Sequence, residues 1–265
     1  MPTVTQHAVG TFSWPELSTT DPAAAKKFYT SLFGWQFRDV PMGELGNYTI
    51  LTLDGNEVGA LTSMMPELQK QGVPPNWLSY VTVENVDDSA NKAKELGGTV
   101  AMGPFDVMDL GRMAVITDPQ GATFSLWQPL KHIGVGVLDE PGALGWTQLN
   151  ARDAAKAKPF YTGLLGWTFR DDAMPGEQGA YTTWLKSDGM AGGMMAMPAT
   201  DPSPPHWLVF WAVRDVDASH AKAVELGARS FVPPTQIPGD MGRIAVLADP
   251  QGAFFALVKF ARARS

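Results

Sequence analysis

Residues 12–39 read FSWPELSTTDPAAAKKFYTSLFGWQFRD, and residues 144–171 read LGWTQLNARDAAKAKPFYTGLLGWTFRD. The two stretches are offset by 132 positions, and 15 of their 28 positions are identical. A second pair has nearly the same offset: GRMAVITDPQGATFSL begins at Gly111 and GRIAVLADPQGAFFAL begins at Gly242. A repeat of this length indicates two copies of one unit. We therefore expect one domain over residues 1–132 and another over 143–265, with a linker at about 131–142.

The first copy opens with the signals of a strand followed by a helix. Asp21 and Pro22 are a typical N-cap residue and first helical residue. Apolar residues then recur at the spacing of an amphipathic helix, and Gly34 ends it; they are Ala25, Phe28, Tyr29 and Leu32. Three strand-like segments separated by glycine-containing turns come next, so the order is one strand, one helix and three strands.

The same order recurs within the copy. A strand is predicted at 78–83, a helix from about 87 to 96, and three more strands by residue 127. Each copy therefore contains two βαβββ modules, and the chain is predicted to be an α+β protein. In the second copy Pro159 stands where the first has Lys27. Because proline removes a helical hydrogen bond, this helix is expected to bend or to start late.

Composition excludes several classes of function. The chain has 20 basic and 27 acidic residues, a net charge of −7, so a phosphate backbone would be repelled, and we expect no nucleic-acid partner. It has no cysteine, which excludes disulfides and thiolate chemistry. The first ten residues lack a signal-peptide pattern, and no apolar run is long enough for a membrane span. We expect a cytoplasmic protein with no membrane partner.

The four modules, the FY–x–x–LFGW and FY–x–x–LLGW helix ends and the DPQGAxFxL strands together resemble the vicinal oxygen chelate superfamily. This superfamily includes glyoxalase I, extradiol dioxygenases and bleomycin-resistance proteins, and the resemblance covers essentially the whole chain. It is closest to the two-domain "hydroxylase" or mycobacterial antigen-like branch. The resemblance implies two tandem domains, each a cleft-shaped half-barrel sheet. It does not name a reaction, because the fold hosts many.

The resemblance also implies where metal ligands would stand in each cleft. At those positions this chain has residues that do not bind divalent metals: Trp14 and Trp146 on the first strands, Leu78 and Leu208 at the second modules, and Ser125 and Ala256 on the last strands. Gly59-Ala60 and Gly192-Gly193 also offer no ligand. We therefore expect neither a metal nor another cofactor.

Glu16 is the predicted polar group of the first cleft. Side chains alternate along a strand, so Glu16 points the same way as Trp14. A carboxyl walled by tryptophan would have a raised pKa, which suits a general base or a hydrogen-bond acceptor. We predict Glu16 and Tyr48 as catalytic residues; the alternative is a rim residue bonded to backbone. Gln148, the counterpart of Glu16, does not titrate, so the two clefts differ.

Aromatic residues occupy matched positions in the two copies and are candidates for a surface on which a flat ligand stacks. Trp35 and Trp167 close the helices and are expected in the core. His206 precedes Trp207 in a cleft-side loop, whereas His7, His132 and His220 are expected at the surface. The predicted ligand-binding residues are Trp14, Trp77, Tyr80, Trp146, Gln148, Tyr181, His206, Trp207 and Phe210.

Two hypotheses of function fit such a cleft. The first is a metal-independent enzyme acting on a small organic molecule, with Glu16 or Tyr48 as acid or base. The second is a non-catalytic protein that sequesters a drug or metabolite between aromatic walls. A metal-dependent lyase or dioxygenase is disfavoured by the ligand positions. Since two copies already supply the pairing that single-domain relatives achieve by dimerising, we expect a monomer.

Overall fold

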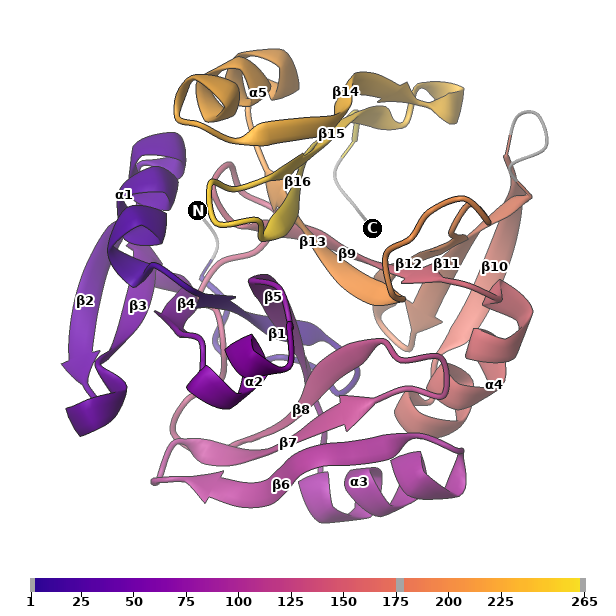
Figure 1. Ribbon diagram of the computed structural model, residues 1–265. Coiled ribbons are helices and arrows are strands. Elements are labelled where there is room, and N and C mark those ends of the chain that lie inside the picture. Colours follow the sequence, from indigo (N-terminus) through magenta and orange to yellow (C-terminus); the bar gives the residue numbers. More distant parts are fainter. Residues whose placement is uncertain (1–2, 175–178, 263–265) are drawn as a thin grey trace.

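Each copy of the repeat forms one curved sheet of eight strands, and the two sheets pack against each other (Figure 1). The computed structural model describes residues 3–174 and 179–262, apart from the side chain of Leu45. The strand orders are β2-β3-β4-β1-β5-β8-β7-β6 and β10-β11-β12-β9-β13-β16-β15-β14. In both sheets the first strands of the two modules pair antiparallel at the centre, β1 with β5 and β9 with β13. The predicted α+β fold of two tandem domains, each with two βαβββ modules, is confirmed.

Among the described residues, the first copy holds eight strands, three α-helices and a short 3₁₀ turn. Its elements are β1 (Phe12–Thr19), α1 (Pro22–Phe33), β2 (Gln36–Pro41), η1 (Gly43–Leu45), β3 (Asn47–Leu53), β4 (Asn56–Ser63), α2 (Pro66–Lys70), β5 (Asn76–Thr82), α3 (Val86–Glu95), β6 (Thr99–Val107), β7 (Gly111–Thr117) and β8 (Thr123–Pro129). The short helix α2 was not predicted, because its five residues are too few for a helical periodicity.

The second copy repeats this order within the described residues, without a counterpart of α2. Its elements are β9 (Leu144–Ala151), α4 (Ala154–Leu165), β10 (Thr168–Ala173), β11 (Ala180–Lys186), β12 (Gly189–Ala196), β13 (His206–Ala212), α5 (Val216–Glu225), β14 (Arg229–Ile237), η2 (Pro238–Asp240), β15 (Gly242–Ala248) and β16 (Phe254–Phe260). None of the helices in the described ranges has the length and apolar character of a membrane span.

Helices α1 and α4 follow from the repeated stretch. Asp21 and Asp153 cap them by accepting hydrogen bonds from the N–H groups of Ala24 and Lys156, and glycines with positive φ end them. Helix α4 begins directly after its cap despite Pro159, so the expected late start is wrong. Pro159 is exposed, and the carbonyl group that it leaves unpaired can bond to water.

The two copies are joined by reciprocal hydrogen bonds in a common core. Tyr29 of α1 donates to Asp249 of the second copy at 3.0 Å, and Tyr161 of α4 donates to Asp118 of the first at 2.9 Å. Each aspartate opens a DPQG turn, and its other oxygen accepts two backbone N–H groups of that turn. The repeated DPQG motif therefore fixes each turn and anchors the helix of the other copy.

Trp77 and Trp207 belong to this core and not to a cleft. They pack in the core cluster that the two copies share, and their indole N–H groups donate to Tyr29 and Tyr161 at 2.9 and 3.0 Å. The prediction that they form part of a ligand-stacking surface is therefore wrong. The reason is strand alternation: Trp77 is three residues from Tyr80 on β5, so the two side chains leave opposite faces of the sheet.

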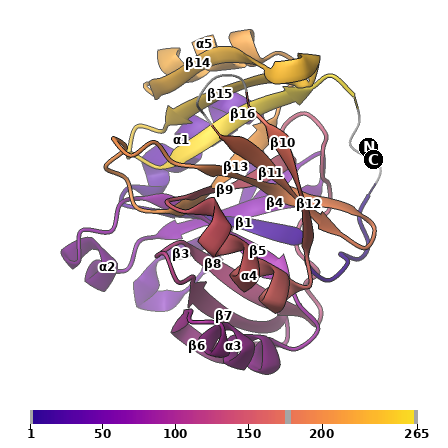
Figure 2. The same cartoon turned by 90° about the vertical axis from the view of Figure 1, so that its right-hand side faces the viewer.

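Trp35 and Trp167 are buried, as expected for core residues. Their indole groups also form hydrogen bonds outside their own copy of the repeat. Trp35 donates to the carbonyl of Gly142 at 2.7 Å, and Trp167 donates to the carbonyl of Gly10 at 3.1 Å. Helix α1 contacts α5, and α3 contacts α4, so each edge of the interface is closed by helices from both copies (Figures 1 and 2).

We predict that Tyr29→Phe and Tyr161→Phe each lower the free energy of unfolding by about 1–3 kcal/mol. Each substitution removes one hydroxyl and leaves both a buried aspartate oxygen and a buried indole N–H without their partner. Urea denaturation measures the loss, and the exposed Lys27→Ala on the same helix is the control, expected within about 0.5 kcal/mol of wild type. A Tyr29→Phe protein as stable as the control would contradict this role of the crossed bonds.

Candidate active site

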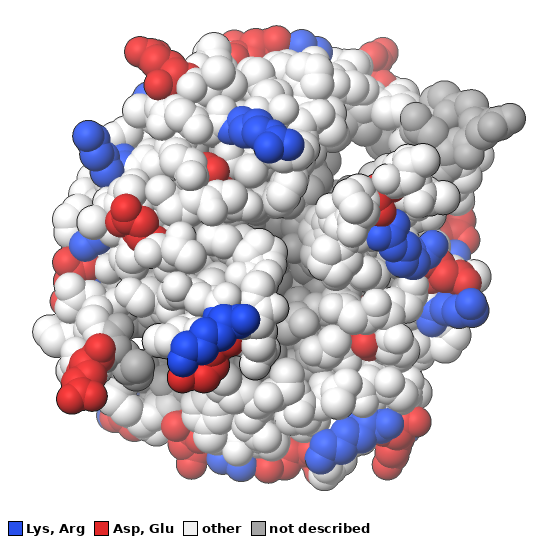
Figure 3. Space-filling model, viewed as in Figure 1, with Lys and Arg blue, Asp and Glu red and all other residues white. Residues whose placement is uncertain are grey.

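The face of each sheet that is turned away from the other sheet is concave (Figures 1 and 2). Aromatic side chains cluster on it. We call these the first and second concave faces. The first is built around Trp14, Tyr80, Met113 and Trp127, and the second around Trp146, Leu208 and Phe210. The space-filling view shows the surface hollowed beside the second sheet, with charged side chains gathered mostly around the rim of the molecule (Figure 3).

Glu16 lies at the centre of the first concave face in a chain of hydrogen bonds. The Trp14 indole N–H donates to the Tyr48 hydroxyl at 3.0 Å, and this hydroxyl donates to Glu16 Oε2 at 2.7 Å. Tyr80, on the neighbouring strand β5, is a second phenol near the Glu16 carboxyl, and its interaction with that group lowers the pKa of Glu16. One carboxyl group is thus held between two phenols on an apolar wall.

Burial raises the pKa of Glu16 above the ordinary value of a glutamate, and the hydrogen bonds from Tyr48 and Tyr80 oppose this shift in part. Burial, together with the nearby carboxylate, also raises the pKa of both tyrosines. The phenols therefore stay protonated as donors over the neutral range. Glu16 is the group that can accept and release a proton.

The second concave face has the same scaffold with different chemistry. Trp146 donates to the Tyr181 hydroxyl at 2.8 Å, as Trp14 does to Tyr48. Gln148 replaces Glu16 and donates to Asn150 at 2.9 Å, and the Asn150 amide lies 3.0 Å from His206 Nε2. Burial raises the pKa of Tyr181 as well, so this hydroxyl also remains protonated.

Tyr48 and Tyr181 occupy matching places on the two faces, but their hydroxyl groups make different contacts. The Tyr181 hydroxyl lies against Gly193, at a place where a Cβ atom would clash with it. In the first copy Ala60 occupies the matching position, opposite Glu16 on strand β1, and the Tyr48 hydroxyl reaches Glu16 instead. The Ala60/Gly193 difference accompanies the Glu16/Gln148 difference and makes the two faces unequal.

The segment between the copies contributes to the first concave face, against the expectation that His132 is a surface residue. The His132 ring lies edge-on to Trp14, with centroids 4.6 Å apart, and its Nε2 is 2.9 Å from Glu57. Val135 is fully buried in the same cluster. His7, also expected at the surface, is buried, and its Nε2 lies 2.9 Å from the carbonyl of Val135.

The structure sorts the predicted site residues into three groups, of which one, Trp77 and Trp207, lies in the core between the copies. Trp14, Glu16, Tyr48 and Tyr80 come together on the first concave face. Trp146, Gln148, Tyr181, His206 and Phe210 lie on the second. Two further residues on these faces were not predicted. Strand alternation from Gln148 could have indicated Asn150, whereas no local pattern indicates His132.

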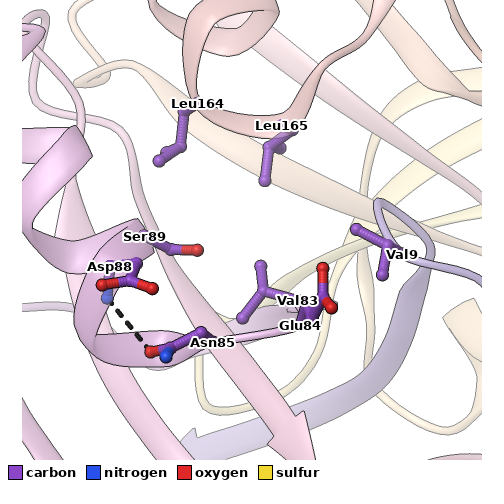
Figure 4. A pocket seen from close by; sticks show the side chains of 8 residues that line it. All are labelled: Val9, Val83, Glu84, Asn85, Asp88, Ser89, Leu164 and Leu165. Atoms are coloured by element: carbon purple, nitrogen blue, oxygen red, sulfur yellow. Dashed lines mark hydrogen bonds between the residues drawn. The ribbon is translucent and has the colours of Figure 1, made fainter.

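Within residues 3–174 and 179–262, no three His, Asp or Glu side chains gather in an arrangement suited to a metal ion. A separate hollow of about 500 Å³ lies between the copies, where the end of α4 faces the start of α3 (Figure 4). Its polar lining is Glu84, Asn85, Asp88 and Ser89, and Asn85 caps α3 by accepting from the Asp88 N–H at 3.1 Å. This hollow is distinct from both concave faces.

Comparisons with known proteins define the class. The model of the Glyoxalase/Bleomycin resistance protein/Dioxygenase superfamily matches residues 7–126 and 143–257. The Mn(II)-bound glyoxalase from Novosphingobium aromaticivorans shares the fold, with a TM-score of 0.65 and 16% identity over 94% of this chain and 82% of that one. This chain therefore belongs to the Glyoxalase/Bleomycin resistance protein/Dioxygenase superfamily, as its sequence motifs predict.

Two relatives match nearly the whole length of this chain. CFP32 of Mycobacterium bovis, provisionally named a glyoxylase, is 42% identical over 260 residues, which cover 98% of each chain. The anthracycline biosynthesis protein DnrV of Streptomyces peucetius is 35% identical over 266 residues, which cover 97% of this chain and 95% of DnrV.

We predict that Glu16→Gln raises the free energy of unfolding at neutral pH. A carboxyl whose pKa is raised by folding lowers stability once it ionises; this penalty is fully present above the folded pKa and absent below the unfolded value of about 4.3. The stability gain of the variant should therefore shrink as the pH falls towards 4. Chemical denaturation at several pH values measures it.

Gln148→Glu is the matched control for this experiment, because it places a new carboxyl at the equivalent position of the second face. It should lower stability at neutral pH and have less effect under acid conditions. A Glu16→Gln protein that is less stable than wild type at neutral pH would contradict the raised pKa of Glu16.

Proposed function

We propose that this protein binds a small, largely apolar organic molecule on the first concave face and that Glu16 performs acid–base chemistry on it. The observation that carries the proposal is the Glu16 carboxyl held by Tyr48 and Tyr80 on an aromatic wall, with its pKa raised by burial. Apolar walls with a few convergent polar groups are typical of small-molecule sites. A carboxyl with a raised pKa is a stronger base at neutral pH than an exposed one.

Relatives in the superfamily include a Mn(II)-bound glyoxalase, so the fit of a divalent metal has to be considered. The donors at the first face are one carboxylate and two phenols, and those at the second are two amides and one imidazole. Divalent metals in proteins take several carboxylate or imidazole ligands at one point. Neither donor set fits, and we propose chemistry that does not pass through a metal.

The proposed reaction is proton transfer. Glu16 would take a proton from an acidic C–H or O–H group of the ligand, and the phenols of Tyr48 and Tyr80 would hold the carboxylate in position by donating to it. Trp14 fixes Tyr48 through its indole N–H. Suitable ligands are uncharged, flat and enolisable or phenolic. The relationship to the anthracycline biosynthesis protein DnrV supports an aromatic ligand of this kind.

A non-catalytic binding protein is the second candidate. The second concave face favours it, because the Gln148 amide stands where the first face has its carboxyl and cannot act as a general acid or base at neutral pH. If the protein only sequesters its ligand, both concave faces can bind it. If it is an enzyme, we propose that the first face is the catalytic one.

Proton exchange in a simple ligand tests the proposal. We expect the protein to bind 1,8-dihydroxyanthrone, a flat molecule with an enolisable methylene group, and to accelerate exchange of that group with D₂O, followed by NMR under nitrogen. Glu16→Gln should keep the binding, measured by quenching of tryptophan fluorescence, and slow the exchange by about 10²–10⁴-fold. Gln148→Ala should leave exchange unchanged.

Three outcomes are decisive. Wild-type exchange rates in Glu16→Gln with intact binding would contradict the catalytic role and leave a binding protein. Loss of exchange on treatment with a chelator, with a stoichiometric metal found by elemental analysis, would overturn the metal-independent chemistry. A protein that does not bind the anthrone would contradict the proposed ligand class.

A further inference from the structure

The second copy has an aromatic and basic surface that the first copy lacks. Phe231 and Phe254 are 42% and 37% exposed, and their rings are 4.6 Å apart. The guanidinium group of Arg229 lies 4.4 Å from the centre of the Phe231 ring. His206 lies on the other side of Phe254, with ring centroids 6.5 Å apart. We call these four residues the Phe231–Phe254 surface.

A hollow of about 430 Å³ lies beside this surface, which is within the size of small-molecule sites. It is formed by the start of β14, the end of β15 and the turn into β16. Arg229, Phe231 and Phe254 line one part of it, and the DPQG turn from Asp249 to Gly252 lines the rest. Exposed rings beside a concavity form a place where a flat molecule can bury its surface.

The first copy serves as an internal control, because the same fold is built there with other residues. Thr99, Ala101 and Thr123 stand at the positions of Arg229, Phe231 and Phe254, and Asn76 stands at that of His206. The Thr123 hydroxyl lies 3.2 Å from that of Thr117. Small polar residues thus suffice to build this corner of the sheet, so the exposed phenylalanines are not required for folding.

Gln251 lines the hollow and differs from its first-copy counterpart in its hydrogen bonds. In the first copy the matching Gln120 binds the backbone of Asp153 twice, accepting from its N–H at 2.8 Å and donating to its carbonyl at 2.9 Å. The Gln251 side-chain oxygen is buried and has no partner among the described residues. Its amide is therefore not committed to the contact between the copies, unlike that of Gln120.

The charge of the hollow favours an anion. Arg229 has no ion pair in the described part of the chain, and its guanidinium group is held on the Phe231 ring. Asp249, the acidic residue in the lining, is 3% exposed, and its oxygens accept from Tyr29 and from two backbone N–H groups. Its charge is thus turned into the core, while that of Arg229 faces the hollow.

We propose that this hollow is a second binding site, separate from the first concave face, for a flat hydroxylated aromatic carboxylate. The aromatic ring would stack on Phe254 and Phe231, the carboxylate would pair with the guanidinium of Arg229, and the hydroxyl would bond to the amide of Gln251. The site does not depend on the proposed acid–base function of Glu16.

Titration with fluorescent 3-hydroxy-2-naphthoate tests the site, and 2-naphthol is the companion probe without a carboxylate. Replacing residues by their first-copy counterparts keeps the fold intact, which circular dichroism verifies. We expect Arg229→Thr to weaken binding of the naphthoate about tenfold and to leave 2-naphthol unchanged. Phe254→Thr should weaken both probes, and the exposed Arg214→Thr should change neither.

Unchanged naphthoate affinity in both Arg229→Thr and Phe254→Thr would overturn the proposal. Affinity that is lost in Glu16→Gln and retained in Phe254→Thr would place the probe on the first concave face, which also overturns it. Conversely, loss in the Arg229 and Phe254 variants with retention in Glu16→Gln supports the second site, whatever the anthrone exchange experiment finds.

Discussion

The crossed hydrogen bonds of Tyr29 with Asp249 and of Tyr161 with Asp118 are the contacts on which the rest of the architecture depends. They bury a carboxylate of each copy beneath the helix of the other. Such a charge is tolerated only when its oxygens are fully bonded, and the backbone of the DPQG turn supplies the remaining donors. The pairing fixes which face of each sheet lies inside the molecule and leaves the concave faces outside.

This arrangement separates the residues that build the protein from those that differ between its copies. The helix caps, the Phe-Tyr pairs and the DPQG turns recur because both halves of a reciprocal interface need the same contacts. The differences fall on the concave faces and at one corner of the second sheet. The first concave face has Glu16 and Ala60 where the second has Gln148 and Gly193. The first face therefore presents a carboxyl group and the second an amide.

The most recognisable motifs of the chain therefore identify its family without identifying its chemistry. DPQG and the glycine-tryptophan helix ends are structural, since their side chains bind across the core. The proposed function depends on side chains that no family motif includes, chiefly Glu16 between two phenols. The Phe231–Phe254 surface also lies outside these motifs, and the first copy shows that the fold does not require exposed aromatic rings there.

Local patterns in the sequence determined the duplication, the βαβββ order and the side of the strand shared by Trp14 and Glu16, because caps, turns and alternation act over a few residues. Alternation also separates Trp77 from Tyr80, but only the packing of the two sheets decided which of them lies in the core between the copies and which lies on the concave face. The place of His132 on Trp14, and the bond between Tyr29 and Asp249 across 220 residues, depend on the tertiary structure alone. Contacts between distant segments leave no periodic trace in the chain, since they arise when the two copies close on each other.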